Sequence, residues 1–146
     1  ANRAAALSGL EPASPAGKAV LAMLAAEALQ DAGDLAAADA ALADIAADGA
    51  VPELYRDLAA LKRLTMEGAP ISAADRDATL DALSRPGGPF RTLAEEQRAL
   101  GLVAAGDTAG ALEIFRVLVQ DAEATPALRE RVQQMITALG GRQSTG

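Results

Sequence analysis

The chain has 146 residues but neither cysteine nor histidine. Without cysteine it forms no disulfide and no thiolate metal site, and without histidine it lacks a common zinc ligand and the usual general base near neutral pH. Ser-His-Asp and Cys-His catalysis are therefore excluded. We expect no catalytic residue, no cofactor and no bound metal, and we do not expect an enzyme.

Aromatic residues are also scarce, at 2% of the chain, although 51% of it is apolar. Alanine and leucine supply most of the apolar fraction, and both are strong helix formers. The β-branched and aromatic residues that favour strands are few. The composition therefore predicts an all-α protein.

Basic residues do not outnumber acidic residues, and the sequence has no long apolar segment. The net charge of −7 would repel a phosphate backbone, so nucleic acid is excluded as a partner. No stretch is apolar for the roughly 20 residues that a membrane span requires. The turn at 86–89 lacks the lysine and the strand of a phosphate loop, and we expect no small-molecule substrate. Because the chain begins at Ala1 and not at a methionine, the sequence is compatible with a membrane anchor upstream of it.

Prolines recur at intervals of 37 residues, at positions 15, 52, 89 and 126. Each precedes an apolar run with helical spacing, and proline is tolerated in the first turn of a helix. Ser14 and Thr125 are good N-cap residues directly before two of them. The spacing therefore predicts a helical repeat.

Each repeat is expected to hold two amphipathic helices. The residues expected to be buried on the first helices are Val20, Leu21, Leu24 and Ala28, then Leu54, Leu58, Leu61 and Leu64, then Leu93, Leu100 and Ala104. On the second helices they are Leu35, Ala38, Leu42 and Ile45, then Leu80 and Leu83, then Ala111, Phe115 and Leu118. A last helix carries Leu128, Val132, Met135 and Leu139.

Two second helices also match in sequence at an offset of 73 residues. The matching segments are Gly33-Asp34-x3-Ala38-x3-Leu42-x2-Ile45-x2-Asp48 and Gly106-Asp107-x3-Ala111-x3-Phe115-x2-Leu118-x2-Asp121. Glycine ends one helix and aspartate caps the next. Ser72 and Asp75 resemble a capping box for the shorter second helix of the middle unit.

The expected organisation follows from these signals. Residues 1–13 are a linker or the end of a preceding helix, and residues 14–141 form the repeat domain, with units 14–50, 51–87 and 88–124 and a capping helix at 125–140. Residues 142–146 are expected to be a flexible tail.

The Gly-Asp-x3-Ala-x3-[Leu/Phe] segments resemble the turn and second helix of tetratricopeptide repeats (TPR). The resemblance implies a TPR-like right-handed helical solenoid of three helical hairpins with a period of about 37 residues, plus a C-terminal capping helix.

A narrower resemblance involves the segments 52–59, 89–91 and 105–141. They are similar to the TPR-like family of membrane-anchored bacterial proteins that includes YfgM, the ancillary subunit of the SecYEG translocon. The resemblance implies a domain at the periplasmic face of the inner membrane, attached through an anchor absent from this chain. Ala1 to Leu10 would then end the linker helix. Without an upstream anchor the expected location is the cytoplasm.

A candidate protein-binding groove consists of Tyr55, Arg56, Lys62, Phe90 and Arg91. First helices of solenoids commonly line the concave groove, and an aromatic residue beside an arginine is typical of binding hot spots. The alternative is that both aromatic rings pack against a neighbouring hairpin. We interpret Lys62-Arg63 and Arg129-x-Arg131 as exposed charges that pair with nearby acids, and Glu95-Glu96 and Asp75, Asp77 and Asp81 as a solvated face.

Two functions remain in view. The first is a membrane-tethered, non-enzymatic scaffold that binds a protein, for which the resemblance implies translocon subunits, a chaperone or a secreted client. The second is a soluble or self-associating TPR-like adaptor with no translocon role.

Overall fold

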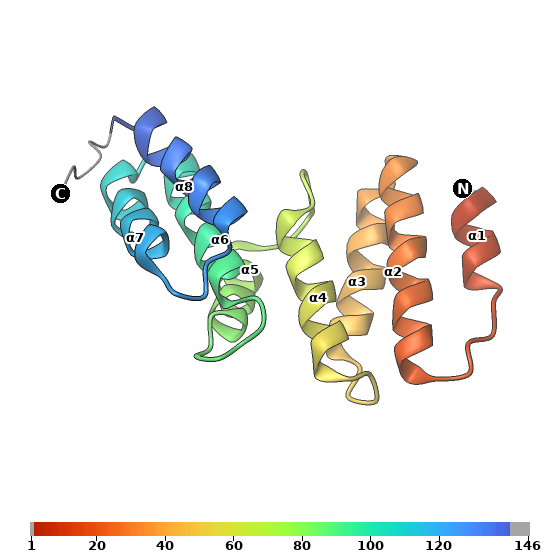
Figure 1. Ribbon diagram of the computed structural model, residues 1–146. Helices are drawn as coiled ribbons and strands as arrows, with labels where there is room; N and C mark the ends of the chain where they lie inside the picture. Colours follow the sequence, from red (N-terminus) through yellow and green to blue (C-terminus); the bar gives the residue numbers. More distant parts are fainter. Residues whose placement is uncertain (1, 141–146) are drawn as a thin grey trace. The chain divides into compact units, whose positions relative to one another are not determined.

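The structure is a computed structural model that describes residues 2–140. Within that range it has eight α-helices and no strand, which confirms the predicted all-α class. The helices are α1 (Asn2–Ser8), α2 (Pro15–Asp31), α3 (Leu35–Ala47), α4 (Glu53–Thr65), α5 (Ala73–Leu83), α6 (Arg91–Ala104), α7 (Thr108–Gln120) and α8 (Pro126–Ala138) (Figure 1). The predicted flexible tail at 142–146 lies outside the described residues.

Two helices begin at the proline caps that the sequence predicts. The side-chain oxygens of Ser14 and Thr125 accept hydrogen bonds from the third backbone N–H after them, at 3.1 and 3.2 Å. Pro15 and Pro126 then occupy the first helical position, where a missing N–H costs nothing. The other two prolines of the series lie just before α4 and α6 rather than inside them.

The α2–α3 and α6–α7 turns share one geometry. Gly33 and Gly106 follow the ends of α2 and α6 with φ of +81° and +84°, a conformation that disfavours any side chain. In both turns the next N–H donates to the carbonyl five residues earlier, at 2.9 Å. Asp34 and Asp107 then cap α3 and α7, with hydrogen bonds of 3.2 and 2.9 Å. The predicted Gly-Asp turns are confirmed.

The contacts divide the chain into two compact units, unit 1 (Ala1–Thr79) and unit 2 (Leu80–Gly146). The division falls inside α5 and inside the predicted second repeat, 51–87. Each unit has its own buried cluster of apolar side chains.

In unit 1, α3 packs against both α2 and α4, α2 also contacts α4, and α1 packs against α2 (Figure 1). The buried cluster of this unit consists of Ala19, Met23, Ala26, Leu42, Ile45, Val51 and Ala59. Alanines make up a large share of it, so the helices meet over small side chains.

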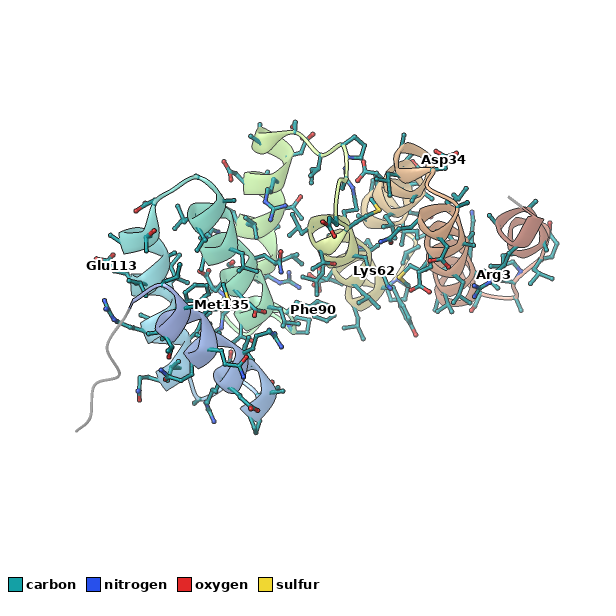
Figure 2. The ribbon with its side chains drawn as sticks, turned by 90° about the horizontal axis from the view of Figure 1, so that it is seen from above. Arg3, Asp34, Lys62, Phe90, Glu113 and Met135 are labelled. Atoms are coloured by element: carbon teal, nitrogen blue, oxygen red, sulfur yellow. The ribbon has the colours of Figure 1, made fainter. Side chains whose placement is uncertain are left out.

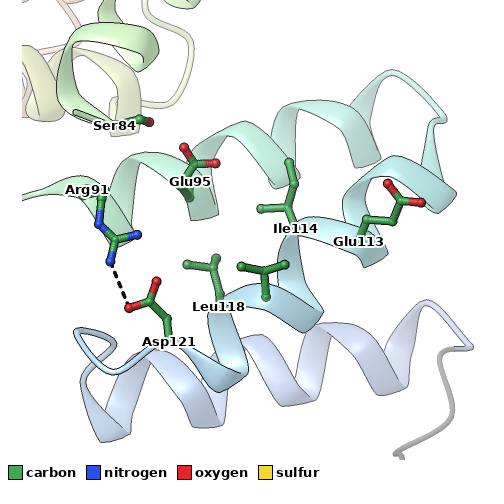
Figure 3. Close-up of a pocket in the computed structure, with 8 residues that line it drawn as sticks. Ser84, Arg91, Glu95, Glu113, Ile114, Leu118 and Asp121 are labelled. Carbon is green, nitrogen blue, oxygen red and sulfur yellow. Dashed lines mark hydrogen bonds and ion pairs between the residues drawn. The ribbon is translucent and has the colours of Figure 1, made fainter. Parts of the chain in front are cut away.

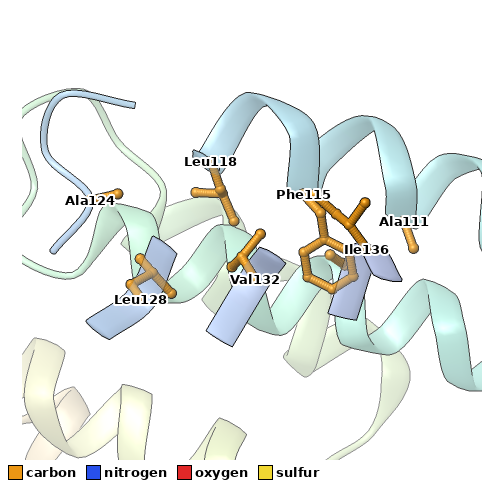
Figure 4. Packing of buried hydrophobic residues seen from close by; sticks show 8 residues of the cluster. Ala111, Phe115, Leu118, Ala124, Leu128, Val132 and Ile136 are labelled. Carbon is orange, nitrogen blue, oxygen red and sulfur yellow. The ribbon is translucent and has the colours of Figure 1, made fainter. Parts of the chain in front are cut away.

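In unit 2, α7 packs against both α6 and α8. The buried cluster consists of Ala99, Ala111, Phe115, Leu118, Ala124, Leu128, Val132 and Ile136. Figure 4 shows Phe115 and Leu118 of α7 lying against side chains of α8. The ring of Phe115 is fully buried and gives this cluster a larger centre than that of unit 1.

The predicted buried stripes are largely correct for the second helices of both matching hairpins, although the predicted Leu35 is half-buried. Ala38, Leu42 and Ile45 are buried on α3, and Ala111, Phe115 and Leu118 are buried on α7. Leu80 and Leu83 are buried on α5 as well. On α8, Leu128 and Val132 are buried as predicted, whereas Ile136 takes the place expected for Met135 and Leu139, which are half-buried.

The stripes predicted for the first helices are largely wrong. On α2 the predicted Ala28 is buried and Leu21 is half-buried, but Val20 and Leu24 are 40% and 36% exposed. The other buried residues of this helix include Ala19, Met23 and Ala26. A helix that contacts neighbours on both sides places its small residues on the contact lines, because they let the backbones approach, and its larger residues lie at the flanks. Ranking residues by hydrophobicity alone therefore selected the wrong face.

The same exchange occurs on α4 and α6. Leu54 is 53% exposed, although Leu61 and Leu64 are buried as predicted. On α6 the buried residues include Ala94 and Ala99, whereas the predicted Leu93 and Leu100 are half-buried and Ala104 is exposed.

Candidate functional site

Three residues of the predicted groove, Tyr55, Arg56 and Lys62, lie on α4 in unit 1. Tyr55 is half-buried and packs against the buried cluster of that unit. Lys62, which Figure 2 shows on α4, places its Nζ 2.5 Å from Oε1 of Glu27 on α2. Arg56 Nε is buried without a hydrogen-bond partner. Tyr55 and Lys62 are thus engaged in contacts inside unit 1.

The other two residues, Phe90 and Arg91, lie at the start of α6 in unit 2. Phe90 is half-buried at the N-cap position. Arg91 donates through Nη2 to Asp121 Oδ1 and through Nε to Glu123 Oε2, both at 2.9 Å. The two hydrogen bonds raise the pKa of Arg91 and join the start of α6 to the loop after α7. The predicted groove residues therefore form two separate sets, one in each unit.

A buried carboxylate that the sequence did not predict lies on α3. Asp39 accepts two hydrogen bonds from Arg63 of α4, at 2.8 and 3.0 Å, with 12% and 16% of the two side chains exposed. The bonds to Asp39 raise the pKa of Arg63. The interpretation of Arg63 as an ordinary exposed charge is wrong, because its guanidinium holds α3 and α4 together in a two-bond geometry.

Glu96 is the second unpredicted buried acid, and it lies on α6. It is 5% exposed and accepts two hydrogen bonds from Arg131 of α8, at 2.5 and 2.8 Å. These bonds raise the pKa of Arg131. Glu96 therefore does not belong to a solvated face, since a charge this deep needs a bonded partner.

The spacing of acidic and basic residues in the sequence indicates ion pairs between helices, which hydrophobic periodicity does not reveal. Glu27 and Lys62 are 35 residues apart, and so are Glu96 and Arg131. Each pair joins the first helix of a hairpin to the helix that follows the hairpin. An acid and a base spaced by nearly one repeat therefore point to stacked helices.

A pocket opens on unit 2 with a volume of about 340 Å³. It lies between α6 and α7, and the residue after α5 closes one side (Figure 3). The residues that line it are Ser84, Arg91, Glu95, Glu113, Ile114, Val117, Leu118 and Asp121. We call it the unit 2 pocket.

The polar rim of the unit 2 pocket is mainly acidic. Its one guanidinium, Arg91, is already bonded to Asp121, as Figure 3 shows. The backbone N–H of Glu123 donates to the Asp121 carboxylate at 2.8 Å, and this bond, with that of Arg91, lowers the pKa of Asp121. Glu95 lies 3.7 Å from Arg98, and the carboxylate of Glu113 makes no hydrogen bond or ion pair with another residue of 2–140.

The apolar wall of the unit 2 pocket is exposed to an unusual degree. Val117 is 67% exposed, the highest value among the large apolar residues described. Ile114 is half-buried, and Leu118 forms the buried floor. At the side toward α5, the hydroxyl of Ser84 has no hydrogen-bond partner among the described residues.

Unit 1 has a pocket at the matching place, with a volume of about 290 Å³. We call it the unit 1 pocket, and Lys18, Ala19, Ala22, Ala41, Asp44, Ile45, Asp48 and Val51 line it. At the offset of 73 residues the two linings correspond as Lys18 with Arg91, Ala22 with Glu95, Ala41 with Ile114, Asp44 with Val117, Ile45 with Leu118 and Asp48 with Asp121. The repeat therefore builds the same hollow twice and lines it with different side chains.

Of these residues, the predicted site contained only Arg91. The sequence held a signal for the rest, since aligning exposed positions at the 73-residue offset pairs Asp44 with the valine at 117. At this position an exposed carboxylate of one hairpin is replaced by an exposed aliphatic side chain in the other, a difference that the periodicity of either helix alone does not reveal.

Among residues 2–140 no group of three or more acidic side chains is arranged to hold a metal ion. Within the same residues, no helix combines the length and hydropathy needed to cross a membrane. Comparison of the chain with protein-family models, curated proteins and solved structures gives no match. The resemblance to the family that includes YfgM therefore stays a hypothesis.

Proposed function

We propose that the chain is a non-enzymatic scaffold of TPR-like repeats that binds another protein through the unit 2 pocket. The observation that carries the proposal is the exposed apolar wall of this pocket, with Val117 at its edge. Aliphatic side chains beside a few fixed polar groups are typical of sites that recognise partners by contact. The repeated turns, caps and ion pairs support the solenoid arrangement, because repeats of this kind stack to bury their apolar faces.

The cellular setting follows from the family resemblance. It supports a domain on the periplasmic side of the inner membrane, with translocon subunits, a chaperone or a secreted client as the partner. A soluble or self-associating adaptor is the alternative, and the exposed Leu54 gives unit 1 an apolar side chain that a second copy would cover.

Site-specific photocrosslinking in the native, full-length protein tests the proposal. A photoreactive residue at position 117 is expected to link a protein partner in cells or native membranes. The same residue at position 20 is the matched control, because Val20 is also an exposed valine on a helix. No adduct from position 117, or equal adducts from both positions, would overturn the proposed site. A covalent dimer of the chain would support the self-associating alternative.

A further inference from the structure

Comparing matching positions of the two pockets shows which side chains the hairpin fold requires and which it does not. Position 117 matches position 44, where unit 1 has an exposed aspartate. Position 114 matches position 41, where unit 1 has alanine. The hairpin forms with either set of side chains, so folding does not require a valine exposed to water at position 117. The requirements of folding therefore do not account for the apolar residues at positions 114 and 117.

The acidic rim differs between the units in the same way. Glu95 stands where unit 1 has Ala22, and Glu113 stands where unit 1 has Ala40. Unit 2 gains a carboxylate at each of these two positions and loses one where Val117 replaces Asp44, so its pocket lining has three carboxylates and that of unit 1 has two. Arg91 does not offset them, because its guanidinium is bonded to Asp121 and Glu123. Glu95 lies 3.7 Å from Arg98, so Glu113 is the rim carboxylate that has no basic partner among residues 2–140, and it lies on α7 beside the aliphatic wall.

The positions of the apolar side chains indicate which kind of partner structure fits the unit 2 pocket. Ile114 and Val117 are three residues apart on α7 and lie on one face of the helix. A pocket of about 340 Å³ holds side chains rather than a whole element. A helix lying along α7 with aliphatic residues at spacings of three and four would insert them here, as amphipathic helices do in grooves.

We infer that the unit 2 pocket binds an amphipathic helix of a partner protein, with its aliphatic side chains against Ile114 and Val117 and its lysine or arginine side chains against Glu95 and Glu113. This inference rests on the proposed function and adds the chemistry of the partner to it. Complementary charge would orient the helix and set the salt dependence of its binding.

Titration with two labelled peptides of about 14 residues, long enough for partial helicity, tests the inference. One contains leucines at spacings of three and four with lysines between them, and the other has glutamates in place of the lysines. The protein is expected to bind the leucine–lysine peptide and not the leucine–glutamate peptide. Equal binding, or a preference for the leucine–glutamate peptide, would overturn the assigned charge.

Substitutions locate the binding on the protein. Val117→Asp gives unit 2 the aspartate of unit 1, and it is expected to weaken binding at least about tenfold even though it adds negative charge. Val20→Asp adds the same charge on α2 and is expected to leave binding unchanged. Equal effects of the two variants, or none from Val117→Asp, would show that the peptide does not use this pocket.

A second pair of variants, one test and one control, examines the acidic rim. Glu113→Gln is expected to weaken binding about threefold or more, and the effect should fade as salt is raised. Glu130→Gln removes another exposed carboxylate, on α8, and is expected to leave binding unchanged. Equal losses in both variants would mean attraction to net charge alone and would refute the site. A partner crosslinked at position 117 without any binding of the leucine–lysine peptide would refute the basic helix and leave the scaffold function standing.

Discussion

The α2–α3 and α6–α7 hairpins have the same backbone geometry at their turns, but the side chains that they bury and expose differ. Both have the left-handed glycine, the aspartate cap and a hollow beside their second helix. At the centre of the stripe, however, Leu42 of α3 matches Phe115 of α7. The turn chemistry is thus constant while core and surface vary, which shows that the turns define the hairpin and leave the other positions free to change.

The comparison extends to the buried polar pair of unit 2. At the 73-residue offset, Glu96 matches Met23 and Arg131 matches Leu58, two apolar residues of the unit 1 core. At these matching positions unit 1 therefore has two apolar residues and unit 2 has an ion pair. Such an exchange is possible because a two-bond arginine–carboxylate pair fills a similar volume while satisfying both charges.

The largest expected difference concerns the centres of the two stripes. Phe115→Ala should lower the free energy of unfolding by about 3–5 kcal/mol and Leu42→Ala by about 2–5 kcal/mol, because each leaves a cavity. Phe115 is fully buried and should give the larger loss. Urea unfolding followed by circular dichroism measures both, with Leu54→Ala as an exposed control. A loss below about 0.5 kcal/mol at position 115 would contradict the assigned stripe.

The Glu96–Arg131 ion pair allows a second test of the comparison between units 1 and 2. Arg131→Leu alone should cost about 1–2 kcal/mol, since it strands Glu96 without its partner; the half-exposed arginine keeps the loss below that of a fully buried pair. Adding Glu96→Met places the methionine and leucine of unit 1 at both positions and should restore or exceed the original stability. A double variant less stable than Arg131→Leu would show that the two contacts are not interchangeable.

These comparisons also show how far sequence reasoning reached. The second helices were predicted well, because Leu42 and Phe115 lie on wide apolar stripes that face a helix on either side. The first helices were not, because alanines such as Ala19 and Ala99 occupy the contact lines and the larger Val20 lies outside them. Hydrophobic ranking does not register that a close contact needs a small side chain.

The candidate site was harder to predict than the fold. Arg91 was selected as a contact residue, and the structure places it in an ion pair at the rim of the pocket. The exposed apolar residue, Val117, was overlooked because a single valine on an amphipathic helix carries little signal by itself. Its meaning emerges only when the matching Asp44 is seen at the same place in the other hairpin.

The shared turn predicts equal effects in the two units. Gly33→Ala and Gly106→Ala should each cost about 1 kcal/mol, because both glycines have a positive φ that an alanine adopts only with strain. Gly49→Ala, at a glycine with ordinary φ and open space around it, is the control and should change stability little. Urea unfolding of the three variants gives the comparison. Unequal losses at positions 33 and 106 would mean that the two turns are not equivalent.

The smallest expected effect concerns pH and the Arg91–Asp121 pair. The pKa of Asp121 is lowered, so its stabilisation is fully present above the ordinary aspartate pKa of about 3.9 and is lost as pH falls through the lower native value. Asp121→Asn should therefore be less stable than the parent protein near neutral pH, and the gap should close below about pH 4. Urea unfolding across this range measures the gap, with Asp44→Asn, which removes an exposed carboxylate of the unit 1 pocket, as the matched control. A gap that stays constant down to about pH 2 would show that Asp121 contributes through its shape rather than its charge, and that the ion pair does not distinguish the unit 2 pocket energetically.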